Sequence, residues 1–231
     1  MKKIKLLLFA LIAFAGIHAN AQTVDEIVNK YVNALGGKEK LASLKTVRMT
    51  GNLSMQGTDI AMVITKSHMI GMRTDIEFNG NSYYQFANAT KGQMFMPPMT
   101  DAEEMDEETF KSFANQMDVQ GGLFNYKEKG STVELVGTEK VSGADAYNLK
   151  VTFKNGKVSN YYIDKTTNRL VKSSGKATMQ GNEMTVETSF SDYKQNTDGF
   201  WFAYTITGLR GPITFNKIET NIPVDEKMFS N

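Results

Sequence analysis

The sequence contains no cysteine. This absence excludes disulfide bonds, a thiol nucleophile and a cysteine-ligated metal. It also excludes a lipid anchor attached to a cysteine. Beyond the N-terminal segment, no apolar run is long and uninterrupted enough to predict a transmembrane helix.

The sequence also contains few histidines and no large excess of either charge. Of the two histidines, His18 lies in the apolar N-terminal segment, and we expect His68 at an exposed strand end. A formal net charge of +1 gives no reason to expect nucleic acid. No G-x-S-x-G, H-E-x-x-H or phosphate-binding glycine motif is present. The sequence therefore predicts no catalytic residue, no metal and no cofactor.

The first 21 residues have the pattern of a signal peptide. Three early lysines precede the apolar run 6–17, and Ala19-Asn20-Ala21 has the form of a cleavage site. We expect cleavage before Gln22, which would change the formal net charge from +1 to −2. The alternative is an N-terminal membrane anchor, but the run is short for that role. The remaining residues, 22–231, suit one domain.

Alternating apolar and polar residues dominate the chain from Thr46 onward. Turn pairs such as Asn79-Gly80 and Asn155-Gly156 separate the alternating segments, as in β-hairpins. We predict about 11–12 strands in meander order, at 46–55, 58–67, 69–78, 82–88, 92–96, 131–137, 145–154, 157–164, 169–179, 183–193, 200–208 and 212–220.

Two segments have helical periodicity. Residues 23–35 predict an amphipathic helix that ends at Gly36-Gly37, followed by a short turn over 38–44. The insert 97–122 interrupts the strands, and we expect Thr100 to cap a helix over 101–117. The acidic run from Asp101 to Glu108 is interpreted as the solvated first turn of that helix rather than a cation site.

These elements predict a mainly β (α+β) fold. A long antiparallel sheet must cover one face, and the two amphipathic helices are the elements available to cover it. A sheet of this size tends to curl. We therefore expect a curled, incomplete antiparallel barrel, with an N-terminal helix and an inserted lid helix over a hydrophobic cavity.

Several segments resemble the LolA-like outer-membrane lipoprotein-sorting proteins of Bacteroidetes-type bacteria. They are "VDEIVNKYVNALGGKEKLASLKTVRMTGNLSMQG", "YKEKGSTVELVGTEKVSGADAYNLKVTFKNGKVSNYYIDKTTNRLVK", "FSDYKQNTDGFWFAYTIT" and "IETNIPVDEKMF". The resemblance covers roughly 24–229 and implies an incomplete barrel that carries acyl chains in the periplasm. Family carriers have a Lys-Arg-Pro-like element whose arginine helps hold the lid. Here Lys66 matches the lysine, but Ser67 and His68 replace the arginine and proline.

The cavity residues are expected among apolar side chains that alternate along the strands or follow the helical stripe of the insert. Methionine suits such a surface because it is flexible and polarizable. The candidate ligand-binding residues are Ile60, Met62, Ile64, Met72, Ile76, Phe78, Tyr84, Phe86, Met94, Met96, Met105, Phe110, Phe113 and Met117, with Thr74 among them on its strand. An ordinary dry core would use the same residues.

The sequence and the resemblance together predict a soluble, monomeric periplasmic protein that is not itself lipidated. Its expected ligand is a lipid or an acylated lipoprotein, with an inner-membrane donor and an outer-membrane acceptor as partners. A structural or sensory envelope module of the same fold is the alternative. A hydrolase and an outer-membrane barrel are further alternatives, and the inserted helices and the final Asn231 disfavour the barrel.

Overall fold

The computed structural model describes residues 23–179 and 182–230. The expected signal peptide and the cleavage point before Gln22 lie outside these residues. The described chain is mainly β, and its strands are β1 (Thr46–Met55), β2 (Thr58–Ser67), β3 (Gly71–Phe78), β4 (Asn81–Asn88), β5 (Gly92–Phe95), β6 (Glu103–Glu104), β7 (Thr132–Val141), β8 (Ala144–Thr152), β9 (Val158–Asp164), β10 (Leu170–Met179), β11 (Asn182–Gln195), β12 (Trp201–Gly208) and β13 (Gly211–Thr220).

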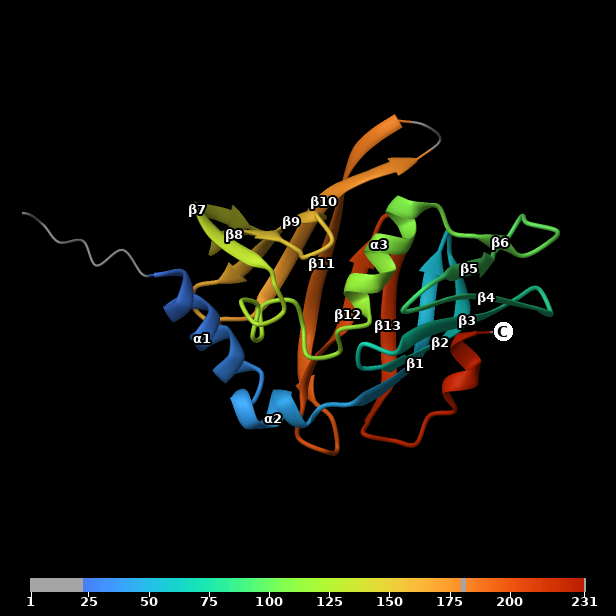
Figure 1. The fold of residues 1–231 in the computed structure, drawn as a ribbon, viewed down its shortest axis with the longest axis horizontal. Coiled ribbons are helices and arrows are strands. Elements are labelled where there is room, and N and C mark those ends of the chain that lie inside the picture. Colours follow the sequence, from blue (N-terminus) through green and yellow to red (C-terminus); the bar gives the residue numbers. More distant parts are fainter. Residues whose placement is uncertain (1–22, 180–181, 231) are drawn as a thin grey trace, which may run out of the picture.

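All 13 strands belong to one antiparallel sheet with the order β6-β5-β4-β3-β2-β1-β13-β12-β11-β10-β9-β8-β7. The chain starts in the middle at β1, runs outward to β6, crosses to the opposite edge at β7 and returns to β13 beside β1 (Figure 1). This order corrects the simple meander, because β1 pairs with β13. It also places β6, within the insert, and β7, the strand after it, at opposite edges of the sheet.

Hairpin turns fix most strand boundaries. β1 and β2 have the predicted limits, and residues Gln56 and Gly57 join them with φ angles of 51° and 80°. Such left-handed turns match the twist of paired strands. The structure confirms the mainly β, open sheet and adds β6 to the 11–12 predicted strands.

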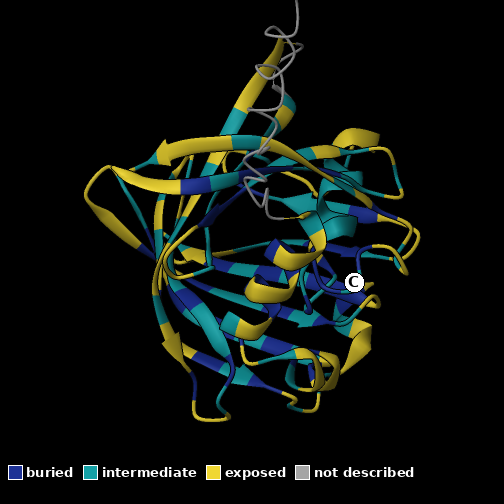
Figure 2. Cartoon of the chain, turned by 90° about the vertical axis from the view of Figure 1, so that its left-hand side faces the viewer, coloured by how far each residue is buried: buried dark blue, intermediate teal, exposed yellow. Residues whose placement is uncertain are grey.

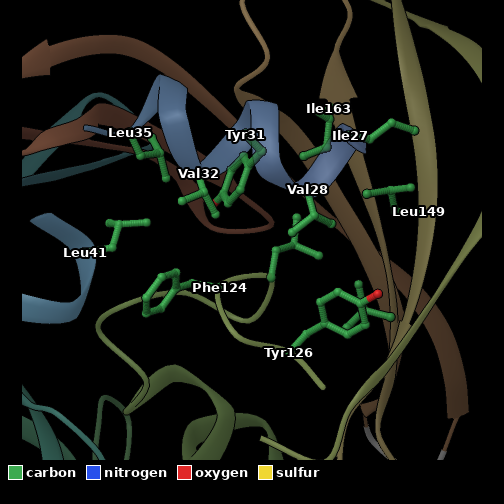
Figure 3. Packing of buried hydrophobic residues seen from close by; sticks show 12 residues of the cluster. Ile27, Val28, Tyr31, Val32, Leu35, Leu41, Phe124, Tyr126, Leu149 and Ile163 are labelled. Carbon is green, nitrogen blue, oxygen red and sulfur yellow. The ribbon is translucent and has the colours of Figure 1, made fainter. Parts of the chain in front are cut away.

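Helix α1 (Val24–Ala34) covers one end of the sheet. Thr23 and Glu26 form the predicted capping box. The helix buries Ile27, Val28 and Tyr31 against residues of β8, β9 and the segment 123–126 (Figure 3). α2 (Lys38–Ser43) follows it and buries Leu41 in the same cluster.

The inserted helix is shorter than predicted. α3 spans Glu107–Gln116, and its N-cap is Asp106, which accepts a hydrogen bond from the Thr109 amide at 2.8 Å. Thr100 is not the cap, because Glu103 and Glu104 pair with β5 and end the extended segment just before Asp106. Of the acidic run, only Glu107 and Glu108 lie in the first turn of α3. Glu103 and Glu104 lie in β6, so the interpretation of the whole run as a helix start was wrong.

Helices α1 and α3 pack on the same face of the sheet, called here the inner face. Cross-strand pairing connects the residues under α3, such as Met72, to those under α1, such as Ile163, on that one face. The strands curve around the helical segments, and buried residues gather on the enclosed side (Figure 2). None of the described helices has both the length and the apolar character needed to cross a membrane.

A short helix that the sequence did not predict covers the opposite, outer face. η1 (Glu226–Phe229) packs on β3 and β4. Its carbonyl groups accept hydrogen bonds from Arg73, which bonds Met228 at 3.1 Å, and Asn88, which bonds Phe229 at 2.9 Å. Phe229 is buried directly over Gly71, where a larger residue would collide with its ring.

Candidate functional site

Strands β1, β2 and β3 align apolar side chains across the inner face. Met62 pairs with Gly51 of β1 and Ile76 of β3, and Ile60 pairs with Leu53. Paired residues of neighbouring strands project from the same face of the sheet. Together with Met96, these side chains form a buried cluster bordered by partly exposed apolar residues. The result is an apolar surface on the inner face of β1, β2 and β3.

Helix α3 lies over the far end of this surface. Phe110 and Phe113 pack against Met72, Ala87 and Met117, yet none of the residues of α3 is fully buried. The apolar side of the helix is therefore incompletely covered by protein. Burial of such surface contributes about 25 cal/mol per Å², so a further apolar group beside α3 would be stabilised.

Polar contacts hold the other side of α3 to the turn 155–157, which connects β8 and β9. The Asn155 side-chain amide donates to the Asn115 side chain and to the Lys111 carbonyl, both at 3.1 Å. Lys157 forms an ion pair with Glu108 at 2.9 Å. α3 thus connects β3 and β4 to the opposite half of the sheet through a small number of contacts.

A cavity of about 590 Å³ lies next to these contacts between α3 and the turn 155–157. Its lining includes Glu108 and Lys111 of α3, the turn at Gly156, and residues of β9, β10 and β11 such as Asn160 and Ser174. The cavity is of mixed polarity and opens to solvent. It marks the side of α3 where the covering of the sheet is incomplete.

The predicted ligand-binding residues divide into two groups by burial. The buried ones are Ile60, Met62, Met72, Ile76, Phe86, Met96 and Met117. The partly exposed ones are Ile64, Phe78, Tyr84, Met94, Met105, Phe110 and Phe113. Most share the inner face with Thr74, and Met105 approaches Gly92 beneath α3. Their role in binding a ligand stays a prediction.

Tyr84 and Phe86 are exceptions, because they lie on the outer face. The two-residue turn after β3 aligns Ile76 with Tyr83, which places Tyr83 rather than Tyr84 on the inner side. Arg73 lies over the Tyr84 ring at 4.6 Å, and Phe86 is fully buried on the same side. The prediction that Tyr84 and Phe86 line the inner face was therefore wrong, because the alternation in β4 was assigned to the wrong face.

A group of polar side chains lies between the two halves of the inner face. Asp118, just after α3, forms an ion pair with Lys129 at 2.6 Å and approaches His68 Nδ1 at 3.5 Å. Burial lowers the pKa of His68, and Asp118 opposes that effect only in part. His68 does follow β2, but it is partly buried beside Asp118 rather than freely exposed as predicted.

Lys66 lies on the inner face, two residues after Ile64 along β2. Its cross-strand partners are Val47 and Met72, both buried. Burial lowers the pKa of the Lys66 ammonium to about 8, and the charge of Asp118 acts in the opposite direction. The sequence contained a signal for this position, because Lys66 continues the inner-face alternation of Ile60, Met62 and Ile64.

Ser67 is buried at the end of β2 and pairs with Thr46 and Gly71. In the resemblance, this position should carry an arginine that helps hold the lid. Among residues 23–179 and 182–230, the polar bonds to α3 come instead from the turn 155–157. No group of three or more acidic or histidine side chains in these ranges could hold a metal ion.

No family model and no curated protein matches this chain. Solved structures do match it. A LolA superfamily protein from Nitrosomonas europaea has 11% identity and a TM-score of 0.55, over 90% of this chain and 98% of its own. A domain from Vibrio parahaemolyticus assigned to outer membrane lipoprotein sorting has 15% identity and a TM-score of 0.52, over 89% and 95% of the two chains.

A DUF1329 family protein from Desulfovibrio piger has 16% identity and a TM-score of 0.56 and covers 90% of this chain and 97% of its own. All three likenesses extend over nearly the full length of both chains. At this identity they show the fold and nothing finer. The fold of this protein is LolA-like, as the resemblance of its sequence implies.

Proposed function

We propose that this chain is a periplasmic binding protein for lipid or for the acyl chains of lipoproteins, and that it is not an enzyme. The observation that carries the proposal is the apolar inner face of β1–β5 under a helix that covers it only partly. The LolA-like fold supports the same conclusion, since two of the similar structures are described by lipoprotein sorting or the LolA name.

In this proposal the acyl chain lies along the methionine-rich inner face and α3 moves to admit it. Met62, Met72 and Met94 offer unbranched side chains that adapt to a flexible chain. Each buried CH₂ group contributes about 0.8 kcal/mol. A chain of a dozen carbons therefore needs few polar contacts to bind. Because only a few bonds join α3 to the turn 155–157, α3 is the element that moves in this proposal.

Native mass spectrometry of the protein exported to a bacterial periplasm tests the proposal. We expect lipid to copurify, and we expect the delipidated protein to take up added acyl chains in a one-to-one complex. A protein that is free of lipid after export and takes up no added acyl chain would contradict the proposal. That outcome would favour a structural or sensory module of the same fold.

A further inference from the structure

The cavity beside α3 lies between three parts of the fold. They are the first half of α3, the segment 155–158 between β8 and β9, and the adjoining residues of β9, β10 and β11. β10 continues past its last pair with β9, which joins Gly175 to Ser159, and Lys176 beyond that pair also lines the cavity. A volume of about 590 Å³ is many times that of one water molecule. The cavity can therefore hold a polar group of a ligand as well as solvent.

The lining of this cavity is rich in hydrogen-bond donors. Lys111, Lys157 and Lys176 contribute three positive charges, against one negative charge from Glu108. Acids outside the lining pair with Lys111 and Lys176, but these acids are largely exposed to water, and such pairs are weak. The uncharged polar side chains of the lining are Asn155, Asn160, Ser174 and Thr185. This combination of ammonium, amide and hydroxyl groups suits an anionic ligand.

Lys157 is the most enclosed of the three lysines, since its side chain is 16% exposed. Its ammonium donates to Glu108 Oε2 at 2.9 Å and to the Lys176 carbonyl oxygen at 3.4 Å. An ammonium has three N–H donors, and these two bonds use two of them. Lys157 therefore points into the space between α3 and β10 and can donate to a ligand there.

Glu108 is a partner that Lys157 can exchange. The Glu108 side chain is 54% exposed, and its second contact, with Lys111, is long at 3.8 Å. A carboxylate this exposed loses little when its ion pair is replaced by water. A ligand anion that enters the cavity can therefore take the place of Glu108 at Lys157.

Helix α3 has a polar side and an apolar side. Glu108, Lys111 and Asn115 follow one another at spacings of three and four residues and share one side of the helix. Phe110 and Phe113 lie on the opposite side and pack against the inner face. The cavity and the apolar surface are thus separated by the width of one helix, about 10 Å. An amphiphile with its head in the cavity can extend its chain beneath α3.

We propose that this cavity binds the anionic head of the amphiphile, a phosphate ester or a carboxylate, and that Lys157 is its main ligand in exchange for Glu108. Lys111, Asn160 and Ser174 supply further donors from the same lining. The acyl chain passes beneath α3 to the inner face. This inference rests on the proposed acyl-chain binding and adds the class of head group and its place.

Ligands that share one chain and differ in the head group test the site. The exported, delipidated protein is titrated by calorimetry at pH 7 with dodecyl phosphate, dodecanoate and dodecanol, and separately with inorganic phosphate. We expect each anionic dodecyl ligand to bind about ten-fold tighter than dodecanol, because charge-assisted hydrogen bonds are the stronger class. Inorganic phosphate should bind much more weakly than dodecyl phosphate. Equal binding of the two phosphates would overturn a lipid head-group site.

Lys157→Met removes the charge and keeps a similar length. We expect it to lower the affinity for both anionic dodecyl ligands to that for dodecanol, while the affinity for dodecanol changes much less. Lys172→Met is the matched control and should keep the wild-type preference. Lys172 is 19% exposed and pairs with Glu187 at 2.9 Å, so its surroundings match those of Lys157, but it lies outside the cavity lining.

Glu108→Gln removes the carboxylate that competes with the ligand for Lys157. It should raise the affinity for dodecyl phosphate about three-fold, the scale of an exposed ion pair, and leave the affinity for dodecanol unchanged. A variant that merely loosened α3 would change all dodecyl ligands by the same factor. Glu187→Gln is the matched control, because Glu187 is the corresponding acid of the Lys172 pair.

The outcomes separate the two proposals. Wild-type protein that binds no dodecyl ligand would contradict acyl-chain binding and, with it, the head-group site. Equal affinity of wild-type protein for dodecanol and the anionic ligands would leave acyl-chain binding intact and overturn the head-group site. A folded Lys157→Met protein that keeps the wild-type preference would overturn it as well. So would a Glu108→Gln protein whose affinities for all dodecyl ligands change equally, and this test holds even if Lys157→Met fails to fold.

Discussion

The Asn155 side chain donates a hydrogen bond to the Asn115 side chain at 3.1 Å and thereby joins α3 to the turn between β8 and β9. The same amide reaches the Lys111 carbonyl, so a single residue of the turn contacts two turns of the helix. α3 is fastened by polar contacts on this side and by apolar packing on β3 and β4 on the other. The asymmetry suggests that α3 opens away from the turn and pivots on its apolar side.

Asn115→Ala should loosen α3. Loss of its contact with Asn155 costs about 1 kcal/mol, which corresponds to roughly five-fold faster local opening. Hydrogen exchange followed by mass spectrometry should show faster exchange over 107–116 and unchanged exchange in β3. Ser112→Ala on the same helix is the control, because the Ser112 hydroxyl donates to the Glu108 carbonyl of α3 itself. Added dodecanoate should change exchange in 107–116, and exchange that is slow and indifferent to lipid would mean that α3 is fixed.

Met62→Gln should weaken acyl-chain binding about ten-fold. The substitution places an amide on the buried inner face, where an unpaired polar group costs about 1–3 kcal/mol. Ala61→Gln is the matched control, because Ala61 is exposed on the outer face of the same strand. Circular dichroism must show that both variants are folded. Equal affinities of the two folded variants for dodecanol would show that Met62 does not face the ligand.

Lys66 should make stability increase with pH in the alkaline range. Its pKa falls from 10.5 to about 8 on folding, so the unfolded chain binds more protons than the folded one between these values. The free energy of unfolding of wild-type protein should therefore rise with pH from about 8 to 10.5, by about 3 kcal/mol at most. Below pH 8 the lysine is charged in both states, and the cost of burying it is fully present.

Urea unfolding of wild-type protein and Lys66→Met across this range isolates the contribution. The charge acting on Lys66 is that of Asp118, whose own contacts are Lys129 and His68. These three residues are unchanged in the variant, so the difference between the two curves reports Lys66. A difference that is flat with pH would refute a desolvated ammonium.

Gly51→Ala should destabilise the pairing of β1 with β13. A Cβ atom at Gly51 would collide with the backbone of Thr214 and Phe215, where the register of the two strands shifts. Overpacking of this kind typically costs about 1–3 kcal/mol, and a backbone obstacle yields less than a side chain. Gly208→Ala in β12 is the control, since no atom lies within 4 Å of its Cβ position. Equal urea midpoints for both variants would contradict the prediction.

Local patterns in the sequence were sufficient to predict most of the sheet. The limits of β1 and β2 follow from period-two alternation and the turn at Gln56-Gly57. The start of α3 was wrong because two acidic residues are drawn into β6 by pairing with β5, which no local preference signals. The pairing of β1 with β13 was missed for the same reason, since it depends on contacts between opposite ends of the described chain.

The candidate site was predicted in its apolar half only. Alternation identifies Ile60, Met62 and Ile64, because the strand period fixes their common face. The polar half depends on where α1, β9 and the segment after α3 meet in space. Nothing in the sequence around Tyr31 or Tyr161 indicates that their hydroxyl groups both lie beside the glycine pair 121–122.

The path of the chain through the sheet has a consequence for its synthesis. β1 through β6 form one local meander and β7 through β13 form another, and only the β1–β13 ladder joins the two within the sheet. Until residues 211–220 have been synthesised and exported, one edge of β1 has no partner. An open strand edge invites pairing with other chains. We therefore expect chaperones to bind newly made protein longest at this edge of β1. Aggregation during expression should start at the same edge.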